Sequence, residues 1–358
     1  MRAHVVRRPY RVLAIVAALA AGLALVGHQR TVTATSRMTT VMLGLENPRG
    51  LAFGPEGGLY VVEAGRGGSD PCPIHRNQPM CYGATGALTR LRGGVQERIA
   101  IGFPSYISPS GEVTGAHDVS ILGVGGAYVT IGFGGDPAQR GVFGPDGALF
   151  GTLVHVAPSG RWWPVADVAA HEGLFNPAGD RVDTNPYGLL VEPDARLVSD
   201  AGANALLDVK PNGQITTLAA FPSRPARSTD AVPTAVVKGP DGAYFVSELT
   251  GTPFTAGAAR IYRVVRGEAP EVYLSGFKTV IDLDFGPDGS LYVLQYATGP
   301  VFFSGPGQVV RVAPDGSRSV VVTGLTMPTS IVVGPDGALY VTNHGTSIGA
   351  GEVVRVEI

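Results

Sequence analysis

The chain has 358 residues, of which 44% are hydrophobic and 16% are charged, and its formal net charge is −2. No cluster of Lys and Arg occurs after the first dozen residues, which argues against nucleic acid as a partner. The 51 Gly and 28 Pro indicate many turns rather than disorder, because the chain is rich in hydrophobic residues.

The N-terminus predicts a signal peptide at residues 1–34. Four arginines precede an apolar run at 12–26, and Val32-Thr33-Ala34 offers a small-residue cleavage site. The run is shorter than the roughly 20 residues that a membrane-spanning helix needs, which favours a cleaved signal over a retained anchor. Export by the general or the twin-arginine route would place the protein outside the cytoplasm, secreted or associated with the cell envelope.

Cys72 and Cys81 are the only cysteines and lie close together in the sequence. In an oxidising compartment such a pair predicts one disulfide bond. A metal site that includes His75 is the alternative reading. It is weaker, because two thiols and one imidazole leave a tetrahedral zinc ion without a fourth ligand.

A turn of the form Gly-Pro-Asp-Gly recurs along the chain, at 54–57 (with Glu in place of Asp), 144–147, 239–242, 286–289 and 334–337. Proline presets φ, Asp bonds to the nearby backbone, and the last Gly takes a positive φ. Apolar residues on both sides predict β-hairpins. The aromatic residues that follow the last three copies, Phe245, Tyr292 and Tyr340, are 47 and 48 residues apart. This spacing matches the period of about 40–50 residues that is typical of β-propeller blades.

We therefore predict that residues 35–358 form an all-β, six-bladed β-propeller. The chain ends after the third strand of its last blade, and the stretch TVMLGL at 40–45 resembles VVVTGL at 320–325. The N-terminal strand is thus expected to close the last blade, which would leave few exposed sheet edges. The turn at 144–147 lies too close to the second blade to start another one and is assigned to a long loop. A seven-bladed ring is the alternative.

Polar residues mark the ends of the predicted inner strands on the face that carries the long loops. The second inner strands end at Glu63, Asp200, Glu248, Gln295 and Asn343, and the first ones begin near Asn47, His117, Asp118, Asn185 and Asp282. Antiparallel pairing brings the two sets together. We expect a polar ring around the central channel, which suits a divalent cation, calcium or zinc, or a polar ligand. The alternative is that these side chains satisfy backbone groups of the fold.

Several stretches resemble the ScyD/ScyE family of bacterial proteins. They include NPRGLAFGPEGGLYVVEAGRGG, YVTIGFGGDP, FGTLVHVAPSGRWWPVADV, VPTAVVKGPDGAYFV and DLDFGPDGSLYVLQYA, and with further matches they cover most of the chain after Gly44. The resemblance implies an exported six-bladed propeller of the NHL or gluconolactonase-like kind. It implies no established reaction, and no catalytic residue is carried over to this sequence.

Two classes of function follow from this reading. One is an accessory propeller, expected to be a monomer, that binds a small molecule or a protein partner on the long-loop face. The other is a metal-dependent lactonase or lyase that acts from the channel. The first is favoured, because catalysis needs a general base with a suitable pKa, and His117 is the one obvious candidate near neutral pH.

Overall fold

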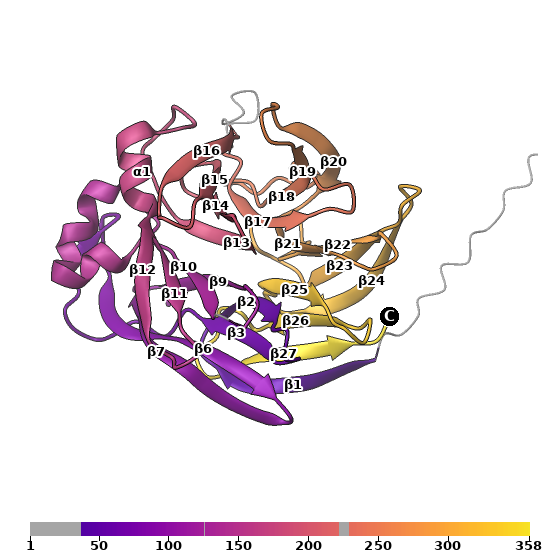
Figure 1. Ribbon diagram of the computed structural model, residues 1–358, viewed down its shortest axis with the longest axis horizontal. Coiled ribbons are helices and arrows are strands. Elements are labelled where there is room, and N and C mark those ends of the chain that lie inside the picture. The colour runs from indigo at the N-terminus through magenta and orange to yellow at the C-terminus, as the bar shows by residue number, and fades with distance from the viewer. Residues whose placement is uncertain (1–36, 125, 222–228) are drawn as a thin grey trace, which may run out of the picture. The chain divides into compact units, whose positions relative to one another are not determined.

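The computed structural model describes residues 37–124, 126–221 and 229–358, and the predicted signal peptide lies outside them. In this part of the chain, six antiparallel sheets are arranged as the blades of a β-propeller, as the sequence predicts. The innermost strand of each blade surrounds the middle of the ring in Figure 1.

Each blade has four main strands, and their order from the channel outward follows their order in the chain. The first three blades comprise β2 (Pro48–Phe53), β3 (Leu59–Glu63), β6 (Cys81–Arg92) and β7 (Val95–Ile107) with the short β8 (Val113–Thr114); β9 (Ala116–Ile121), β10 (Ala127–Ile131), β11 (Thr152–Val156) and β12 (Trp162–Asp167); and β13 (Pro186–Glu192), β14 (Ala195–Asp200), β15 (Ala205–Val209) and β16 (Ile215–Ala220).

The remaining three blades follow the same order, except that the last one takes its outer strand from the N-terminus. They comprise β17 (Pro233–Lys238), β18 (Tyr244–Glu248), β19 (Ala259–Val264) and β20 (Glu271–Phe277); β21 (Val280–Phe285), β22 (Leu291–Gln295), β23 (Gly307–Val312) and β24 (Arg318–Leu325); and β25 (Ser330–Val333), β26 (Leu339–Asn343), β27 (Gly351–Val356) and β1 (Met38–Leu45).

The predicted closure of the ring by the N-terminal strand is confirmed. Strand β1 pairs antiparallel with β27, and Met38 lies opposite Val356 while Leu45 lies opposite Gly351. Met42 and Leu45 of β1 are almost completely buried, and they pack in a cluster with Leu51 of the first blade. The first and last blades are therefore held together by both ends of the chain.

The repeated turns join the two inner strands of a blade, as expected. In the copy at 239–242, the Asp241 carboxylate accepts a hydrogen bond from the Ala243 amide, and Gly242 has φ of 83°. The copy at 144–147 instead lies in the helical segment η1 (Pro137–Leu149), within the long connection between β10 and β11. The prediction that this copy lies in a long loop is therefore confirmed.

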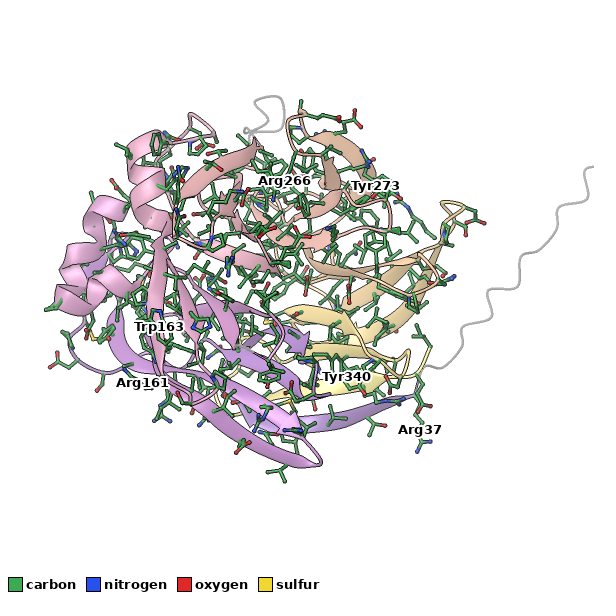
Figure 2. All side chains as sticks on the ribbon, viewed as in Figure 1. Arg37, Arg161, Trp163, Arg266, Tyr273 and Tyr340 are labelled. Atoms are coloured by element: carbon green, nitrogen blue, oxygen red, sulfur yellow. A yellow bond between two sulfur atoms is a disulfide. The ribbon has the colours of Figure 1, made fainter. Side chains whose placement is uncertain are left out.

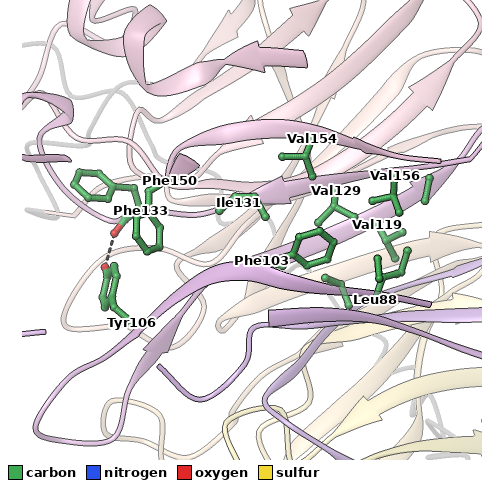
Figure 3. Close-up of a cluster of buried hydrophobic side chains, with 14 of the residues drawn as sticks. Leu88, Phe103, Tyr106, Val119, Val129, Ile131, Phe133, Phe150, Val154 and Val156 are labelled. Atoms are coloured by element: carbon green, nitrogen blue, oxygen red, sulfur yellow. Dashed lines mark hydrogen bonds between the residues drawn. The ribbon is translucent and has the colours of Figure 1, made fainter. Parts of the chain in front are cut away.

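Apolar side chains fill the space between neighbouring blades (Figure 2). Each of the six hydrophobic clusters combines residues from two adjacent blades. Between the first two blades, Leu88 and Phe103 face Val119, Val129 and Val154 (Figure 3). Because every interface has its own core, the ring is stabilised by burial between blades as well as by pairing within them.

The long connections all lie on one face and carry the remaining elements. They include the hairpin of β4 (Ile74–His75) and β5 (Gln78–Pro79) and the helix α1 (Val168–Phe175). The predicted disulfide joins Cys72 to Cys81 across the first of these loops. No helix in the described part of the chain is long and apolar enough to cross a membrane.

Candidate functional site

The innermost strands begin at the long-loop face, and most of them begin with an irregular register. In β2, β9, β13, β17 and β21 the pairing with the next strand shifts directly after the first residue. Such bulges re-aim the side chains that follow, and they are frequent next to active sites. The residues at this position are Arg49, His117, Tyr187, Thr234 and Ile281.

Arg49, His117 and Tyr187 gather near the propeller axis together with Tyr296, which follows β22. We call these four residues the channel mouth. The rings of His117 and Tyr187 lie 4.5 Å apart, and the charge of Arg49 affects the pKa of each of the other three residues. Tyr187 of the third blade packs against the cluster shared by the fifth and sixth blades. The channel mouth therefore joins opposite sides of the ring.

Arg49 is a buried cation, with 7% of its surface exposed. Its guanidinium donates to the carbonyl of Gly345 in the loop after β26 and, at 3.1 Å, to the carbonyl of Val113 in the short strand β8. The structure pairs it with no carboxylate among the residues that it describes. A guanidinium has five N–H donors, so these two bonds leave donors for a further acceptor. A buried positive charge without a counter-ion is costly, which makes this position favourable for an anion.

His117 is a neutral imidazole at the same level. Its Nδ1 lies 3.0 Å from the carbonyl oxygen of Pro186, so Nδ1 carries the proton and Nε2 keeps the lone pair. Burial, followed by the charge of Arg49, lowers the pKa of His117 to about 3. The side chain can therefore accept a hydrogen bond, but it is a weak base near neutral pH.

The carboxylates of Asp118 and Asp282 form a second layer below the mouth. Asp118 accepts from the Leu189 amide of the next blade at 2.7 Å, and Asp282 accepts from the Ile331 amide at 2.9 Å. Both side chains thus tie the inner strands of neighbouring blades together. Burial raises the pKa of Asp282 to about 7, and burial and the charge of Asp282 raise that of Asp118 well above its usual range.

The polar ends of the second inner strands hold the connections between blades. Glu63 accepts from the Glu46 amide at 2.7 Å and forms two bonds with Arg98. Asp200 accepts from the Thr184 hydroxyl and the Asn185 amide, both at 2.6 Å.

Other candidates on this rim are also bonded to nearby groups of the fold. Asn343 accepts from the Thr326 amide at 2.7 Å and donates to Glu352. Glu248 lies 3.5 Å from the Tyr262 hydroxyl. The Asn185 carboxamide accepts from the Phe133 amide. The predicted ring is thus divided into a rim of structural bonds and the more central layer of Asp118 and Asp282.

No three or more His, Cys, Asp or Glu side chains in the described ranges are placed to hold a metal ion. In addition, the channel mouth carries the cation Arg49, which repels a divalent ion. The expected calcium or zinc site is therefore not found among the candidates on the rim.

A cavity of about 230 Å³ lies beside Asn185, and Arg76, Asp180 and Asp183 line it. A second crevice of about 200 Å³ lies between the first two blades, next to Tyr60 and Val124. The second crevice opens near the repeated turn at 54–57, so it belongs to the tight-turn side of the ring and not to the channel mouth.

Comparison with known proteins supports the fold. No protein-family model matches the sequence, and no curated protein is similar to it. Among solved structures, a glucose dehydrogenase has a TM-score of 0.55 at 15% identity over 90% of this chain and 99% of its own. A proposed gluconolactonase has a TM-score of 0.53 at 14% identity, and the match covers 90% of this chain and 92% of its own. A streptogramin B lyase has a TM-score of 0.51 at 12% identity, and the match covers 90% of this chain and 97% of its own. At these identities the likeness concerns the β-propeller fold alone.

Of the four residues at the channel mouth, His117 is among the candidates that the sequence predicts, whereas Arg49, Tyr187 and Tyr296 are not. A signal was present for two of them, because Arg49 and Tyr187 each follow an Asn-Pro pair at the start of an inner strand. The repeat therefore aligned these residues with one another. What the repeat did not reveal is that a bulge at this position turns them toward the axis.

Proposed function

We propose that this protein binds a small anionic molecule at the channel mouth, with Arg49 as the group that recognises the anion. One observation carries the proposal: Arg49 is buried, bonded to two backbone carbonyls, and paired with no carboxylate among the described residues. A carboxylate or phosphate would supply the missing charge and accept the remaining donors of the guanidinium. Tyr187, Tyr296 and the Nε2 atom of His117 provide further groups for orientation.

Binding is favoured over a lactonase or lyase reaction. A general base is most effective when its pKa lies near the working pH, and the pKa of His117 is lowered to about 3. The candidates for metal ligands are bonded to the fold on the rim. The solved propellers named as a gluconolactonase and a lyase support the fold and not the reaction.

We also propose that the chain is an exported, monomeric member of the ScyD/ScyE family that acts outside the cytoplasm. The stretches quoted above support the family. The Cys72–Cys81 disulfide supports the location, because disulfides persist mainly in oxidising compartments. A partner protein on the long-loop face would be an alternative occupant.

The test uses benzoate as a probe for the anion site and benzyl alcohol as its neutral analogue. We expect ligand-observed NMR to detect binding of benzoate but not of benzyl alcohol to the wild-type protein. Arg49→Met should weaken benzoate by about 10- to 100-fold, since a hydrogen bond to a charged group contributes about 1.5–3 kcal/mol. Arg161→Met is the matched control, because Arg161 is exposed at the outer part of the ring (Figure 2).

Two results would count against the proposal. If Arg49→Met lowers the melting temperature but leaves benzoate binding unchanged, Arg49 only holds together the two segments whose carbonyls it contacts. If mass spectrometry finds that the protein converts an added lactone or ester and that the conversion requires His117, an enzyme is the better description.

A further inference from the structure

A cluster of apolar side chains lies on the long-loop face beside the channel mouth. Val301, Phe302 and Phe303 belong to the loop between β22 and β23, and 60%, 53% and 37% of their surfaces are exposed. Phe254, from the loop between β18 and β19, lies 4.1 Å from the ring of Phe303 and 6.2 Å from that of Phe302. We call these four residues and Tyr296 the aromatic shelf.

Tyr296 belongs both to the shelf and to the channel mouth. Its ring meets the ring of Phe303 edge to face at 4.9 Å. Burial raises the pKa of Tyr296, and the positive charge of Arg49 opposes that rise. A continuous series of ring contacts therefore leads from Tyr296 at the channel mouth, across Phe303 and Phe254, to the exposed ring of Phe302.

The shelf is built on a tightly bonded loop. The Gly299 amide donates to the Ser304 carbonyl at 2.6 Å, and the Ser304 amide donates to the Val301 carbonyl at 2.9 Å. The ammonium group of the buried Lys278 donates to the Gly299 carbonyl from below. These bonds hold the apolar residues at the tip in place, although their side chains are partly exposed.

Two residues of the aromatic shelf have an unusual backbone conformation. Phe254 has φ of 56° and Phe302 has φ of 43°, a region that bulky side chains rarely occupy. Such conformations cost free energy, and they persist where the surrounding structure enforces them, often at ligand-binding sites. Here both of them present a phenylalanine ring at the surface beside the mouth.

We infer that the ligand of the channel mouth has a flat aromatic body of at least two fused rings, which stacks on the shelf while its anionic group reaches Arg49. The inference rests on the proposed function, because the cation is one of its two anchors. Aromatic rings prefer offset or edge-to-face contact with other rings, and Phe302 and Phe303 are the partly exposed rings of the shelf. The exposed part of the shelf comprises only a few side chains, which suits a small molecule better than a protein interface of about 800 Å² per partner.

The experiment compares benzoate with 2-naphthoate, which differs by one fused ring, and with the neutral 2-naphthalenemethanol. The second ring adds roughly 40 Å² of apolar surface, so 2-naphthoate should bind about fivefold more tightly than benzoate to the wild-type protein. In the double variant Phe302→Ser/Phe303→Ser this gain should fall below about twofold, while benzoate affinity stays within about twofold of wild type. The neutral compound should bind more weakly than 2-naphthoate, because it lacks the charge.

Phe175→Ser is the matched control. Phe175 ends α1 on another part of the same face and is 62% exposed, so it is comparable with Phe302 but lies outside the shelf. It should retain the full gain from the second ring. Because Phe303 packs on two rings, the single variant Phe302→Ser is measured as well, and melting temperatures show that each variant is folded.

The outcomes separate the two claims. Suppose that benzoate binds through Arg49 but 2-naphthoate binds no more tightly than benzoate, or that Phe175→Ser abolishes the tighter binding of 2-naphthoate as the shelf variant does. The shelf is then not part of the site, and the proposed function stands. If neither carboxylate binds to the wild-type protein, the proposed function and this inference fall together. If 2-naphthalenemethanol binds as tightly as 2-naphthoate and without Arg49, the shelf holds neutral ligands and the combined ligand is wrong.

Discussion

Met42 in strand β1 offers a sharp test of how the ring is closed. Its side chain is 1% exposed and packs with Leu51 and Val353, whereas the neighbouring Leu43 is 65% exposed. Replacing a buried Met with Ala costs about 2–5 kcal/mol, because apolar contacts are lost and a cavity remains. Replacing an exposed side chain usually changes the free energy of unfolding by less than about 0.5 kcal/mol.

The two substitutions should therefore separate clearly in a thermal melt. For a unit of this size, 1 kcal/mol corresponds to roughly 2 °C, so Met42→Ala should lower the melting temperature by about 4–10 °C and Leu43→Ala by about 1 °C or less. Both residues lie in the same strand, and both variants keep the backbone bonds of β1 to β27. The assay is circular dichroism at a fixed scan rate.

A pair of truncations extends the test to the whole strand. A chain that begins at residue 37 retains β1, whereas one that begins at residue 47 loses it. The loss exposes the surfaces that Met42 and Leu45 cover, at about 1.5–3 kcal/mol for each side chain, and leaves the edge of β27 unpaired. Equal melting temperatures for the two chains, or for Met42→Ala and Leu43→Ala, would refute closure by β1.

Three further predictions concern charge and covalent structure. Burial and the nearby carboxylate of Asp200 raise the pKa of Glu172 to about 7, so the stability that Glu172 contributes is present at low pH and is lost as pH rises from about 4.5 to 7. Glu172→Gln should therefore melt higher than wild type at pH 8 and equally at about pH 4. A variant that melts lower than wild type at pH 8 would contradict this. The imidazole of His117 is neutral above pH 5. Benzoate affinity should therefore depend on pH in the same way for wild type and His117→Gln between pH 5 and 8. A gain in wild-type affinity below pH 6.5 that is absent in the variant would mean that the imidazole takes up a proton there. Thiol titration of the denatured protein should find no free cysteine, and Cys72→Ser/Cys81→Ser should lower the free energy of unfolding by about 2–3 kcal/mol; two free thiols in the exported protein would exclude the bond.

The fold could be predicted from the sequence because the residues that specify it form short patterns that recur along the chain. The turn at 239–242 needs Pro, Asp and a Gly with positive φ, and these residue types stand at the same positions in the turns of the last three blades, at 239–242, 286–289 and 334–337. The match between 40–45 and 320–325 predicts that β1 belongs to the last blade, and its pairing with β27 confirms this. The turn at 144–147 could be assigned to a loop by its spacing alone, although its helical form could not.

The candidate site was predicted less well, because a sequence does not reveal what a polar strand end is bonded to. Glu63 and Asp200 have the residue types of metal ligands, yet Arg98 and backbone amides occupy their oxygens. Arg49 stands between a proline and a glycine in an ordinary strand start, and only its place near the axis distinguishes it. Long-range contacts around the ring decide both cases, and the Asn-Pro pair before Arg49 marks its position in the repeat but not its partners.

A crystal structure of the protein with 2-naphthoate tests the central claim most directly. The account predicts that the carboxylate lies within about 2.7–2.9 Å of the Arg49 guanidinium, with the fused rings against Phe302 and Phe303. A ligand bound in the crevice beside Tyr60 and Val124 or in the cavity beside Asp183, with no density next to Arg49, would contradict it.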